Sequence, residues 1–239
     1  MSRCLITDLD GTFLGGPDAD RTRLHTMFAE RERPHRLVYC SGRAYPKIKR
    51  DIDTGVLPEP NAIIGDVGCG LWSATGESLC ERFDLEVAGR WGGAREKVLQ
   101  QVANLDGLRL QDETGPSRCS FLYERMEVAQ EAARRIEPLG LDTLISGGRY
   151  FDVLPRGVNK GFAVKYLMNL WGLDAKSVLV AGDTLNDLAM LQLPIPAVAV
   201  GNADEQLCAE LKLDATTHLA ERTGAGGILE AFTVYGWSR

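Results

Sequence analysis

Short apolar runs alternate with helical patterns along most of this 239-residue chain, and this alternation constrains the fold more than any other feature. Each run is rich in Val, Ile, Leu or Ala and ends close to Gly, Asp or Ser, which is typical of strands buried on both faces of a parallel sheet. Strand, helix, strand repeats require right-handed crossovers, so we predict a doubly wound, mostly parallel α/β core of the Rossmann-like kind. The predicted strands are 3–7, 36–40, 62–64, 177–181 and 197–200, and the predicted helices are 21–32, 45–53, 161–171, 187–191 and 205–211.

The middle of the chain departs from this rhythm. An αββαββ order there packs most simply as an antiparallel sheet with helices on one face, and Gly147-Gly148 marks a hairpin turn between its last two strands. We therefore expect an α+β cap at 83–155, inserted into a core made of 1–82 and 156–239. The elements expected in the cap are helices at 94–104 and 128–137 and strands at 108–111, 118–124, 142–146 and 149–154.

Composition limits the classes of function. The formal net charge of −6 argues against nucleic acid or an anionic membrane as the main partner, and no apolar run approaches the roughly 18 residues of a membrane span. The first residues run directly into a predicted strand, which leaves no room for a signal peptide. The six cysteines are scattered without C-x-x-C spacing, so we expect reduced, buried thiols in a cytoplasmic protein. Nothing in the sequence fixes an oligomeric state.

Two carboxylates stand at the end of the first predicted strand, in Asp8-Leu9-Asp10-Gly11-Thr12. Side chains alternate along a strand, so Asp8 and Asp10 are expected to point to the same side. Gly11 lets the backbone leave the strand abruptly, and Thr12 adds a hydroxyl beside the negative charge. Such a pair suits a nucleophile and an acid/base partner at one reacting atom, whereas a strand that ends in a polar turn is the alternative.

Two further segments carry groups that suit a phosphate. Ser41-Gly42-Arg43 follows the second predicted strand, at the edge of a parallel sheet where open α/β proteins bind ligands. The Ser41 hydroxyl and the following N–H groups can donate to a phosphate oxygen, or Ser41 can cap a helix. Lys160 stands beside glycines at the start of a predicted helix. It can face a phosphate or Asp8, or it can remain a solvated surface charge.

A second acidic segment, Gly182-Asp183-Thr184-Leu185-Asn186-Asp187, follows the strand at 177–181. Asp183 and Asp187 are one helical turn apart at the same predicted edge, and their oxygens suit Mg²⁺, which keeps waters and bridges to substrate phosphate. Asn186 can coordinate the ion or orient a carboxylate. N-capping by Asp183 is the alternative, but it leaves Asp187 unexplained.

The segments D-L-D-G-T, S-G-R, N-K-G and G-D-T-L-N-D, in this order, resemble the motifs of the haloacid dehalogenase superfamily of phosphotransferases. The resemblance covers essentially the whole chain. It implies that Asp8 attacks phosphorus to form an aspartyl-phosphate, while Asp10 protonates the leaving alkoxide and later activates water. It also implies Mg²⁺ held by Asp8, the Asp10 backbone carbonyl and Asp183, with Asp187 in or near its shell. The groups implied to stabilise the transferring phosphoryl are Ser41, the Gly42 amide and Lys160, with Thr12 supporting the Asp8 loop.

The same resemblance narrows the class within the superfamily. Dehalogenases do not need the second aspartate as acid/base, so Asp10 favours phosphoryl chemistry, and the lack of long apolar runs excludes a P-type ATPase. The expected cap lies between Ser41 and Lys160. Its αββαββ order resembles the cap of sugar phosphatases and of some phosphomannomutases.

Finer matches resemble the sucrose-phosphate phosphatase group: 151–155 (F-D-V-L-P), 200–203 (V-G-N-A), 224–228 (G-A-G-G-I) and the loop at 64–71. The departures are Leu185, where the group commonly has a small residue, D-x-D-G-T in place of D-x-D-N-T, and 117–121 in place of a segment that often contains Lys. The resemblance implies a Mg²⁺-dependent phosphatase for a small-molecule sugar phosphate, with sucrose-6-phosphate as the first candidate. The alternatives are a phosphatase for mannosyl-glycerate phosphate or a hexose phosphate, a phosphomannomutase-like mutase, and a sugar-phosphate-binding regulator without turnover.

Four polar residues are candidate sugar or phosphate contacts, because a polyol needs planar donors and acceptors around its hydroxyls. They are Arg43, Asp66, Arg118 and Ser120. A structural salt bridge or cap is the alternative for each of them. The four tryptophans are expected in core packing rather than sugar stacking, and the three histidines show no paired spacing and receive no role.

Overall fold

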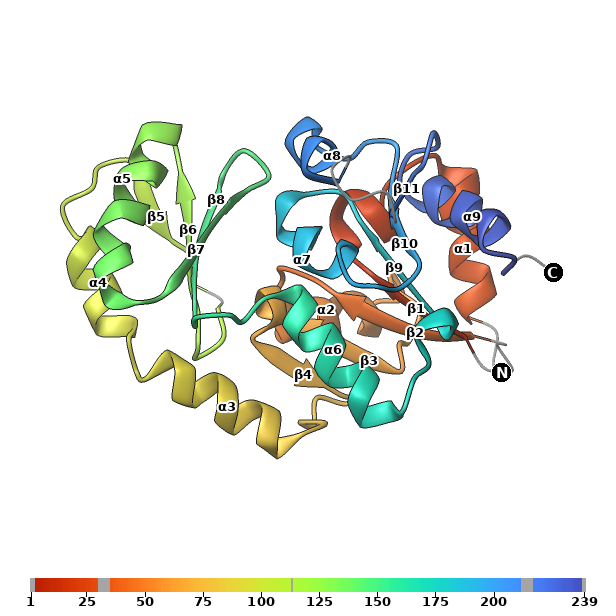
Figure 1. The fold of residues 1–239 in the computed structure, drawn as a ribbon, viewed down its shortest axis with the longest axis horizontal. Helices are drawn as coiled ribbons and strands as arrows, with labels where there is room; N and C mark the ends of the chain where they lie inside the picture. The colour runs from red at the N-terminus through yellow and green to blue at the C-terminus, as the bar shows by residue number, and fades with distance from the viewer. Residues whose placement is uncertain (1–2, 30–34, 113, 212–216, 238–239) are drawn as a thin grey trace.

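The computed structural model describes residues 3–29, 35–112, 114–211 and 217–237. Within these residues the larger of two sheets is parallel except for its last pair of strands (Figure 1). Its strands lie in the order β11 (Thr217–Leu219), β10 (Ala197–Ala199), β9 (Val178–Gly182), β1 (Arg3–Thr7), β2 (His35–Cys40), β3 (Ala62–Gly65) and β4 (Gly70–Trp72). The predicted α/β fold class is confirmed.

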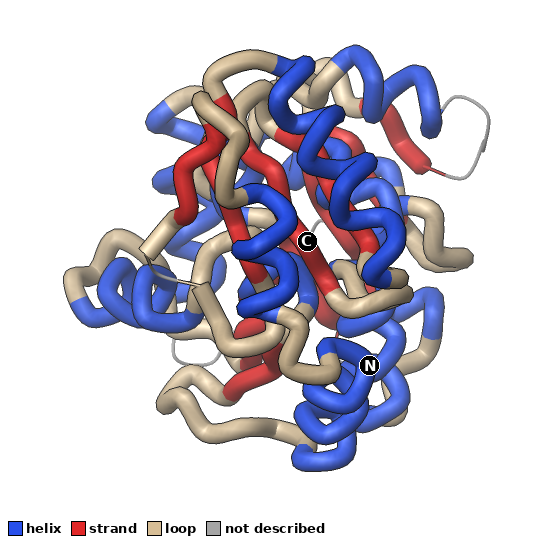
Figure 2. The backbone as a smooth tube through the Cα atoms, turned by 90° about the vertical axis from the view of Figure 1, so that its left-hand side faces the viewer, coloured by secondary structure: helices blue, strands red, loops and turns tan. Residues whose placement is uncertain are grey.

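Both faces of the larger sheet are buried, as the apolar runs predict. Along β1, Cys4 and Ile6 face one apolar cluster, and Leu5 faces another. Each fully buried side chain of this size contributes about 1.5–3 kcal/mol of stability. Figure 2, viewed from the side of α4 and α5, shows strands surrounded by helices and loops. One cluster includes residues of α3 (Glu81–Trp91), α6 (Lys160–Trp171), α7 (Leu188–Leu191) and α8 (Glu205–Leu211), and the other includes residues of α1 (Asp18–Ala29), α2 (Tyr45–Asp53) and α9 (Ala225–Val234).

A smaller antiparallel sheet, built from the middle of the chain, lies beside the larger one (Figure 1). Its strands lie in the order β5 (Leu108–Leu110), β6 (Cys119–Tyr123), β8 (Tyr150–Leu154) and β7 (Asp142–Ser146). Alternate residues of β6 and β8, such as Phe121 and Phe151, form a third apolar cluster with α4 (Arg95–Val102) and α5 (Met126–Ile136). Ser120 and Asp152, which alternate with these apolar residues along β6 and β8, lie opposite each other and point to the other face of the sheet.

Among the described α-helices and strands, four have no range predicted from the sequence: α3, β4, β11 and α9. The two strands have only three residues each, and α3 spans the stretch where the first crossing between core and cap was expected. Phe83 and Val87 of α3 pack in a cluster of the larger sheet, whereas Trp91 packs in the third cluster. The division into a cap at 83–155 and a core therefore stays a prediction. Helix α3 lies at its first boundary and packs against both sheets.

All six cysteines are free thiols, as expected, but only three of them, Cys4, Cys40 and Cys119, are buried. The other three, Cys69, Cys80 and Cys208, are partly exposed. Within the described part of the chain, no helix combines the length and the apolar character needed to cross a membrane.

Candidate active site

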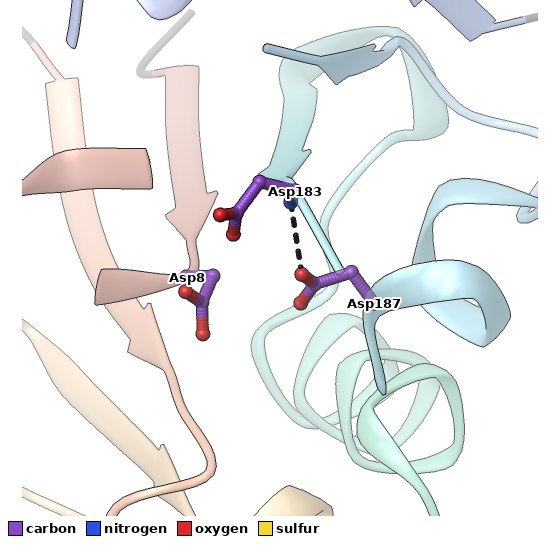
Figure 3. Close-up of side chains that lie close together, drawn as sticks. All are labelled: Asp8, Asp183 and Asp187. Atoms are coloured by element: carbon purple, nitrogen blue, oxygen red, sulfur yellow. Dashed lines mark hydrogen bonds between the residues drawn. The ribbon is translucent and has the colours of Figure 1, made fainter. Parts of the chain in front are cut away.

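The ends of two neighbouring parallel strands bring the acidic segments together. Thr7 of β1 lies opposite Ala181 of β9, and the Asp8 N–H donates to the Ala181 carbonyl at 2.9 Å. The residues that follow each strand therefore meet at one edge of the sheet. Oxygens of Asp8, Asp183 and Asp187 lie within 4.8 Å of one another, and all three residues are buried (Figure 3).

The turn after Asp8 requires glycine. Gly11 has φ of 80°, and a Cβ at this position would lie 2.0 Å from Asp183 Oδ2. A side chain would thus meet both an unfavourable backbone conformation and a carboxylate. Next to it, the Thr12 hydroxyl donates to Asp183 Oδ1 at 2.9 Å, which fixes that carboxylate against the Asp8 loop.

Lys160 supplies the buried cation of this cluster. It is the first residue of α6, whose N-cap Asn159 accepts a hydrogen bond from the Phe162 N–H at 2.9 Å. Its ammonium is fully buried and lies 2.6 Å from Asp8 Oδ1 and 2.6 Å from Asp187 Oδ1. The alternative of a solvated surface lysine is therefore wrong.

Burial and mutual repulsion shift the ionisation of these groups. Burial raises the pKa of Asp8 to about 7, against the opposing effect of Lys160. Burial and the charges of Asp8 and Asp187 raise the pKa of Asp183 to about 8. Burial disfavours the charged form of Lys160, but the Asp187 and Asp8 carboxylates outweigh it and raise the pKa of the ammonium.

Asp187 shapes the loop that carries Asp183. Its Oδ2 accepts hydrogen bonds from the N–H groups of Asp183 and Thr184, each at 3.0 Å, while its Oδ1 binds Lys160. With Thr184 it forms a capping box, so Asp187 rather than Asp183 contributes to the helix cap. Both Asp187 oxygens thus already have partners. Asp187 accepts three hydrogen bonds, whereas Asp183 accepts two, from Thr12 and Asn202, and Asp8 accepts one from Lys160, so Asp8 and Asp183 keep more lone pairs for a metal.

The donor set fits a hard divalent cation. Three buried carboxylates face one ammonium, so negative charge remains uncompensated, and carboxylate oxygens are the ligands that Mg²⁺ prefers. The composition of the site therefore agrees with the magnesium expected from the sequence.

Asp10 lies apart from this buried cluster. Its side chain is 66% exposed and forms a two-point ion pair with Arg43, at 2.8 Å from Nε to Oδ2 and 2.5 Å from Nη2 to Oδ1. Arg43 is itself held by Asp51 at 2.5 Å. Strand alternation does not explain this arrangement, because β1 ends at Thr7.

Asp8 and Asp10 nevertheless line one cavity of about 320 Å³ between the two sheets. The other predicted residues on its wall are Ser41, Gly42, Arg43, Arg118, Ser120 and Asn186. The buried side-chain oxygen of Asn186 accepts no hydrogen bond in the described part of the chain. A larger cavity, of about 590 Å³, lies between α5, β7 and α7, and no residue of the acidic cluster lines it. Asp8 is the member of the cluster that lines the smaller cavity, whereas Asp183, Asp187 and Lys160 lie behind its wall.

Comparisons with known proteins identify the family of this chain. A family model described as sucrose-6F-phosphate phosphohydrolase matches residues 1–236. The chain belongs to this family. A mannosylfructose-phosphate phosphatase from Agrobacterium fabrum is 30% identical over 98% of this chain and 97% of its own length. The resemblance to the sucrose-phosphate phosphatase group is thereby confirmed.

Other relatives of this sucrose-6F-phosphate phosphohydrolase family member include a much longer protein and a solved structure of similar length. A glucosylglycerol-phosphate synthase from Pseudomonas anguilliseptica is 37% identical over 98% of this chain, which spans 31% of that protein. The sucrose-phosphatase from Synechocystis, solved with sucrose and phosphate, has a TM-score of 0.87 with 24% identity and covers 99% of both chains. That similarity establishes the shared fold.

Several polar residues of this family member were not singled out as site residues from the sequence. Asn202 donates to the Gly11 carbonyl at 3.1 Å and to Asp183 Oδ2 at 3.4 Å, and it accepts from the Gly224 N–H at 2.8 Å. Asn202 and Gly224 lie in the segments 200–203 and 224–228, which resemble the sucrose-phosphate phosphatase group. That resemblance was the sequence signal that could have pointed to Asn202. Cavity residues contributed by the smaller sheet and its loops were also missed: Gln111, Thr114, Ser146, Tyr150 and Asp152.

All four candidate sugar or phosphate contacts bind each other or neighbouring protein groups, Arg43 through its pairs with Asp10 and Asp51. Arg118 pairs with Asp66 and Asp152, and the Ser120 hydroxyl accepts from Arg118 at 3.0 Å and from Gln111 at 2.6 Å. The alternative of structural ion pairs thus describes Asp66 and Arg118 in this structure.

Proposed function

We propose that the chain is a Mg²⁺-dependent phosphatase that hydrolyses a sugar phosphate through an aspartyl-phosphate on Asp8. The observation that carries this proposal is the buried cluster of Asp8, Lys160 and Asp183, whose member Asp8 lines a cavity with polar residues on its wall. A buried carboxylate next to an ammonium can attack a phosphorus atom whose negative charge the ammonium balances.

In the first step an Asp8 oxygen attacks phosphorus and the bond from phosphorus to the sugar oxygen breaks. Lys160 contacts Asp8 and is suited to balance charge on the transferring group, and the Ser41 hydroxyl and Gly42 N–H face the same cavity. The leaving alkoxide takes a proton from Asp10. In the second step Asp10 takes a proton from water as the water attacks phosphorus, which releases phosphate and restores Asp8.

The role of Asp10 requires a movement. Its carboxylate is paired with Arg43, so it must turn from the guanidinium toward the substrate oxygen. Because the Asp10 side chain is largely exposed, this rotation displaces water rather than packed side chains.

The residues proposed to hold Mg²⁺ are Asp8, Asp183 and the Asp10 backbone carbonyl, with Asp187 and Asn186 near them. When bound, the ion supplies positive charge that offsets repulsion between the carboxylates and the phosphate dianion. Thr12 and Asn202 act on the Asp183 carboxylate by holding it in place.

The substrate class follows from the relatives and from the cavity wall. The relatives are described as acting on or making sucrose, mannosylfructose and glucosylglycerol phosphates, all of which join a glycosyl unit to a phosphorylated sugar or polyol. The wall offers groups suited to hydroxyls, among them Gln111, Ser146 and Asp152. We therefore propose a phosphorylated glycoside, with sucrose-6-phosphate as the first compound to test.

The test is a phosphate-release panel with Mg²⁺. It contains sucrose-6-phosphate, mannosylfructose phosphate, glucosylglycerol phosphate, mannosyl-glycerate phosphate and free hexose phosphates, with Asp8→Asn as the matched inactive variant. We expect release from at least one glycoside phosphate and none with Asp8→Asn. Full activity in that variant would contradict the nucleophile assignment, and isomerised sugar phosphate without free phosphate would indicate a mutase. Tight binding without turnover across the panel would indicate a regulator.

A further inference from the structure

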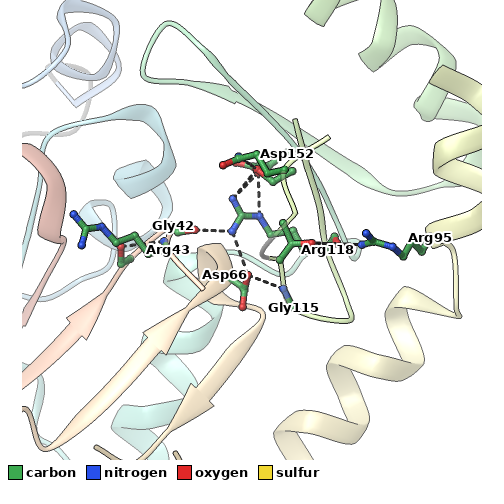
Figure 4. A network of polar contacts seen from close by, with 11 residues as sticks. Gly42, Arg43, Asp66, Arg95, Gly115, Arg118 and Asp152 are labelled. Carbon is green, nitrogen blue, oxygen red and sulfur yellow. Dashed lines mark hydrogen bonds and ion pairs between the residues drawn. The ribbon is translucent and has the colours of Figure 1, made fainter. Parts of the chain in front are cut away.

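Arg118 lies between the two sheets and binds groups from both. It directly precedes β6, and its guanidinium donates to Asp152 Oδ1 of β8 from Nε at 3.0 Å and from Nη2 at 2.6 Å. The same guanidinium donates to the Gly42 carbonyl at 2.6 Å and to Asp66 Oδ1 at 3.3 Å (Figure 4). Gly42 and Asp66 lie in loops that follow β2 and β3 of the larger sheet. One side chain therefore joins the smaller sheet to two loops of the larger one.

These charges are buried together. The side chains of Asp66 and Asp152 are each 3% exposed, and that of Arg118 is 6% exposed. Burial disfavours the charged guanidinium, but the Asp152 and Asp66 carboxylates outweigh it and raise the pKa of Arg118. A buried set of this kind is stable only while each charge keeps its partner. Without Arg118 the two carboxylates would face each other across the sheets.

The turn that carries Asp66 is strained and closely packed. Asp66 and Val67 have φ of 51° and 56°, a region that a β-branched residue such as valine rarely adopts. Asp66 Oδ1 also accepts the Gly115 N–H at 3.0 Å. The next residue, Gly68, lies so close to the Asn159 carbonyl that a Cβ there would be 2.3 Å from its oxygen. The turn thus touches the backbone directly before Lys160.

We propose that Arg118 is a positioning residue that fastens the smaller sheet over the cavity and thereby fixes the Ser41-Gly42 and Asn159-Lys160 segments. Its contacts with Gly42 and with the Asp66 turn carry this effect to the two segments. The inference rests on the proposed function only for its kinetic consequences. It replaces the sequence hypothesis that Arg118 and Asp66 bind the sugar.

Hydrogen exchange of the Gly115 amide tests the fastening directly, because this N–H is bonded to Asp66 across the two sheets. In Arg118→Gln we expect exchange of this amide to accelerate roughly tenfold to a hundredfold, as loss of a bond to a charged group predicts. Arg118→Lys keeps the charge and should recover part of the protection. Arg135→Gln is the matched control, since Arg135 pairs with Glu131 within α5. Unchanged protection in Arg118→Gln overturns the proposal.

Kinetics separate fastening from sugar binding. If Arg118 positions the phosphate segments, Arg118→Gln should lower kcat for p-nitrophenyl phosphate as well as for the sugar phosphate. A higher KM for the sugar phosphate alone, with p-nitrophenyl phosphate unaffected, identifies a sugar contact and overturns the proposal. Should Arg118→Gln not fold, Asp152→Asn weakens the hold on Arg118 with little change in shape, leaves the Asp66 acceptor of the Gly115 amide in place, and is held to the same exchange criterion. If the wild type releases no phosphate, the proposed function fails while the exchange result still decides the fastening.

Discussion

Replacing Lys160 with methionine isolates the contribution of the buried ammonium. The substitution keeps most of the side-chain volume but removes two ion pairs of 2.6 Å, to Asp8 and to Asp187. Among the described residues, three carboxylates then share the site without this cation. Breaking a buried pair by removing one partner costs about 3–5 kcal/mol. For a chain of this length that corresponds to a fall in Tm of about 6–20 °C.

The pKa values of the neighbouring carboxyls predict how the destabilisation by Lys160→Met changes with pH. Asp8 and Asp183 have pKa values of about 7 and about 8, above the usual 3.8. A carboxyl whose pKa is raised in the folded state binds protons more tightly there, so stability is present at low pH and is lost as pH rises through the folded pKa. Removing Lys160 raises these values further. The deficit of Lys160→Met should therefore be larger at pH 8 than at pH 5.5.

The assay is urea unfolding followed by tryptophan fluorescence in metal-free buffer at both pH values. Lys49→Met is the control, because Lys49 forms an exposed pair with Asp53 on one helix and should change little. Two results would refute the reasoning: a free energy of unfolding for Lys160→Met within about 1 kcal/mol of wild type at pH 8, or a deficit that grows toward pH 5.5. Either would mean that the carboxylates do not depend on the ammonium.

Three further outcomes are expected. Gly11→Ala should destabilise the chain by about 1–3 kcal/mol and weaken Mg²⁺ binding measured by calorimetry. Gly55→Ala is the control, because Gly55 also has a positive φ but a Cβ there meets no atom within 4 Å. A similar loss of Mg²⁺ affinity in both variants would contradict the clash with Asp183. Asp187→Asn should lower the free energy of urea unfolding by about 1.5–3 kcal/mol, because it loses the bond to Lys160 and disturbs two backbone bonds. An unchanged free energy of unfolding would exclude a role for Asp187 in holding this loop. Mg²⁺ affinity should rise on the order of several hundredfold from pH 6 to pH 8 with proton release, since both Asp8 and Asp183 must lose protons to bind metal. Calorimetry in two buffers measures this, and equal affinity at the two pH values would contradict the raised pKa values.

The sequence was sufficient to predict the parallel core and the segments of the acidic site. Asp8 and Asp183 each follow an apolar run, and the carboxyl ends of parallel strands share one edge, so their meeting needs only the strand assignment. Short elements were not predictable in the same way. β4 and β11 each have three residues, too few to show a period, and are held by pairing with β3 and β10.

Partners of long charged side chains were also beyond the sequence. Arg43 binds Asp10 and Asp51, and Arg118 binds Asp66 at a separation of 52 residues. An arginine fork can reach several carboxylates, and only tertiary packing selects among them. For the same reason the sequence favoured no partner for Lys160 until the end of β1 and the start of α6 were placed together.

Under the proposed function, phosphate chemistry and sugar recognition depend on two different sets of positions in the fold. The nucleophile Asp8 follows a strand of the larger sheet, and its cation Lys160 begins a helix that packs on that sheet. A change in either residue should alter the rate of hydrolysis of every substrate alike. The leaving group faces alternate positions of β6 and β8, where Ser120 and Asp152 point away from the apolar cluster that Phe121 and Phe151 form. Polar substitutions on the cavity face can therefore change the sugar without disturbing the packed face. Asp152 and Ser120 are exceptions, because both accept hydrogen bonds from Arg118, which links that face to the phosphate segments.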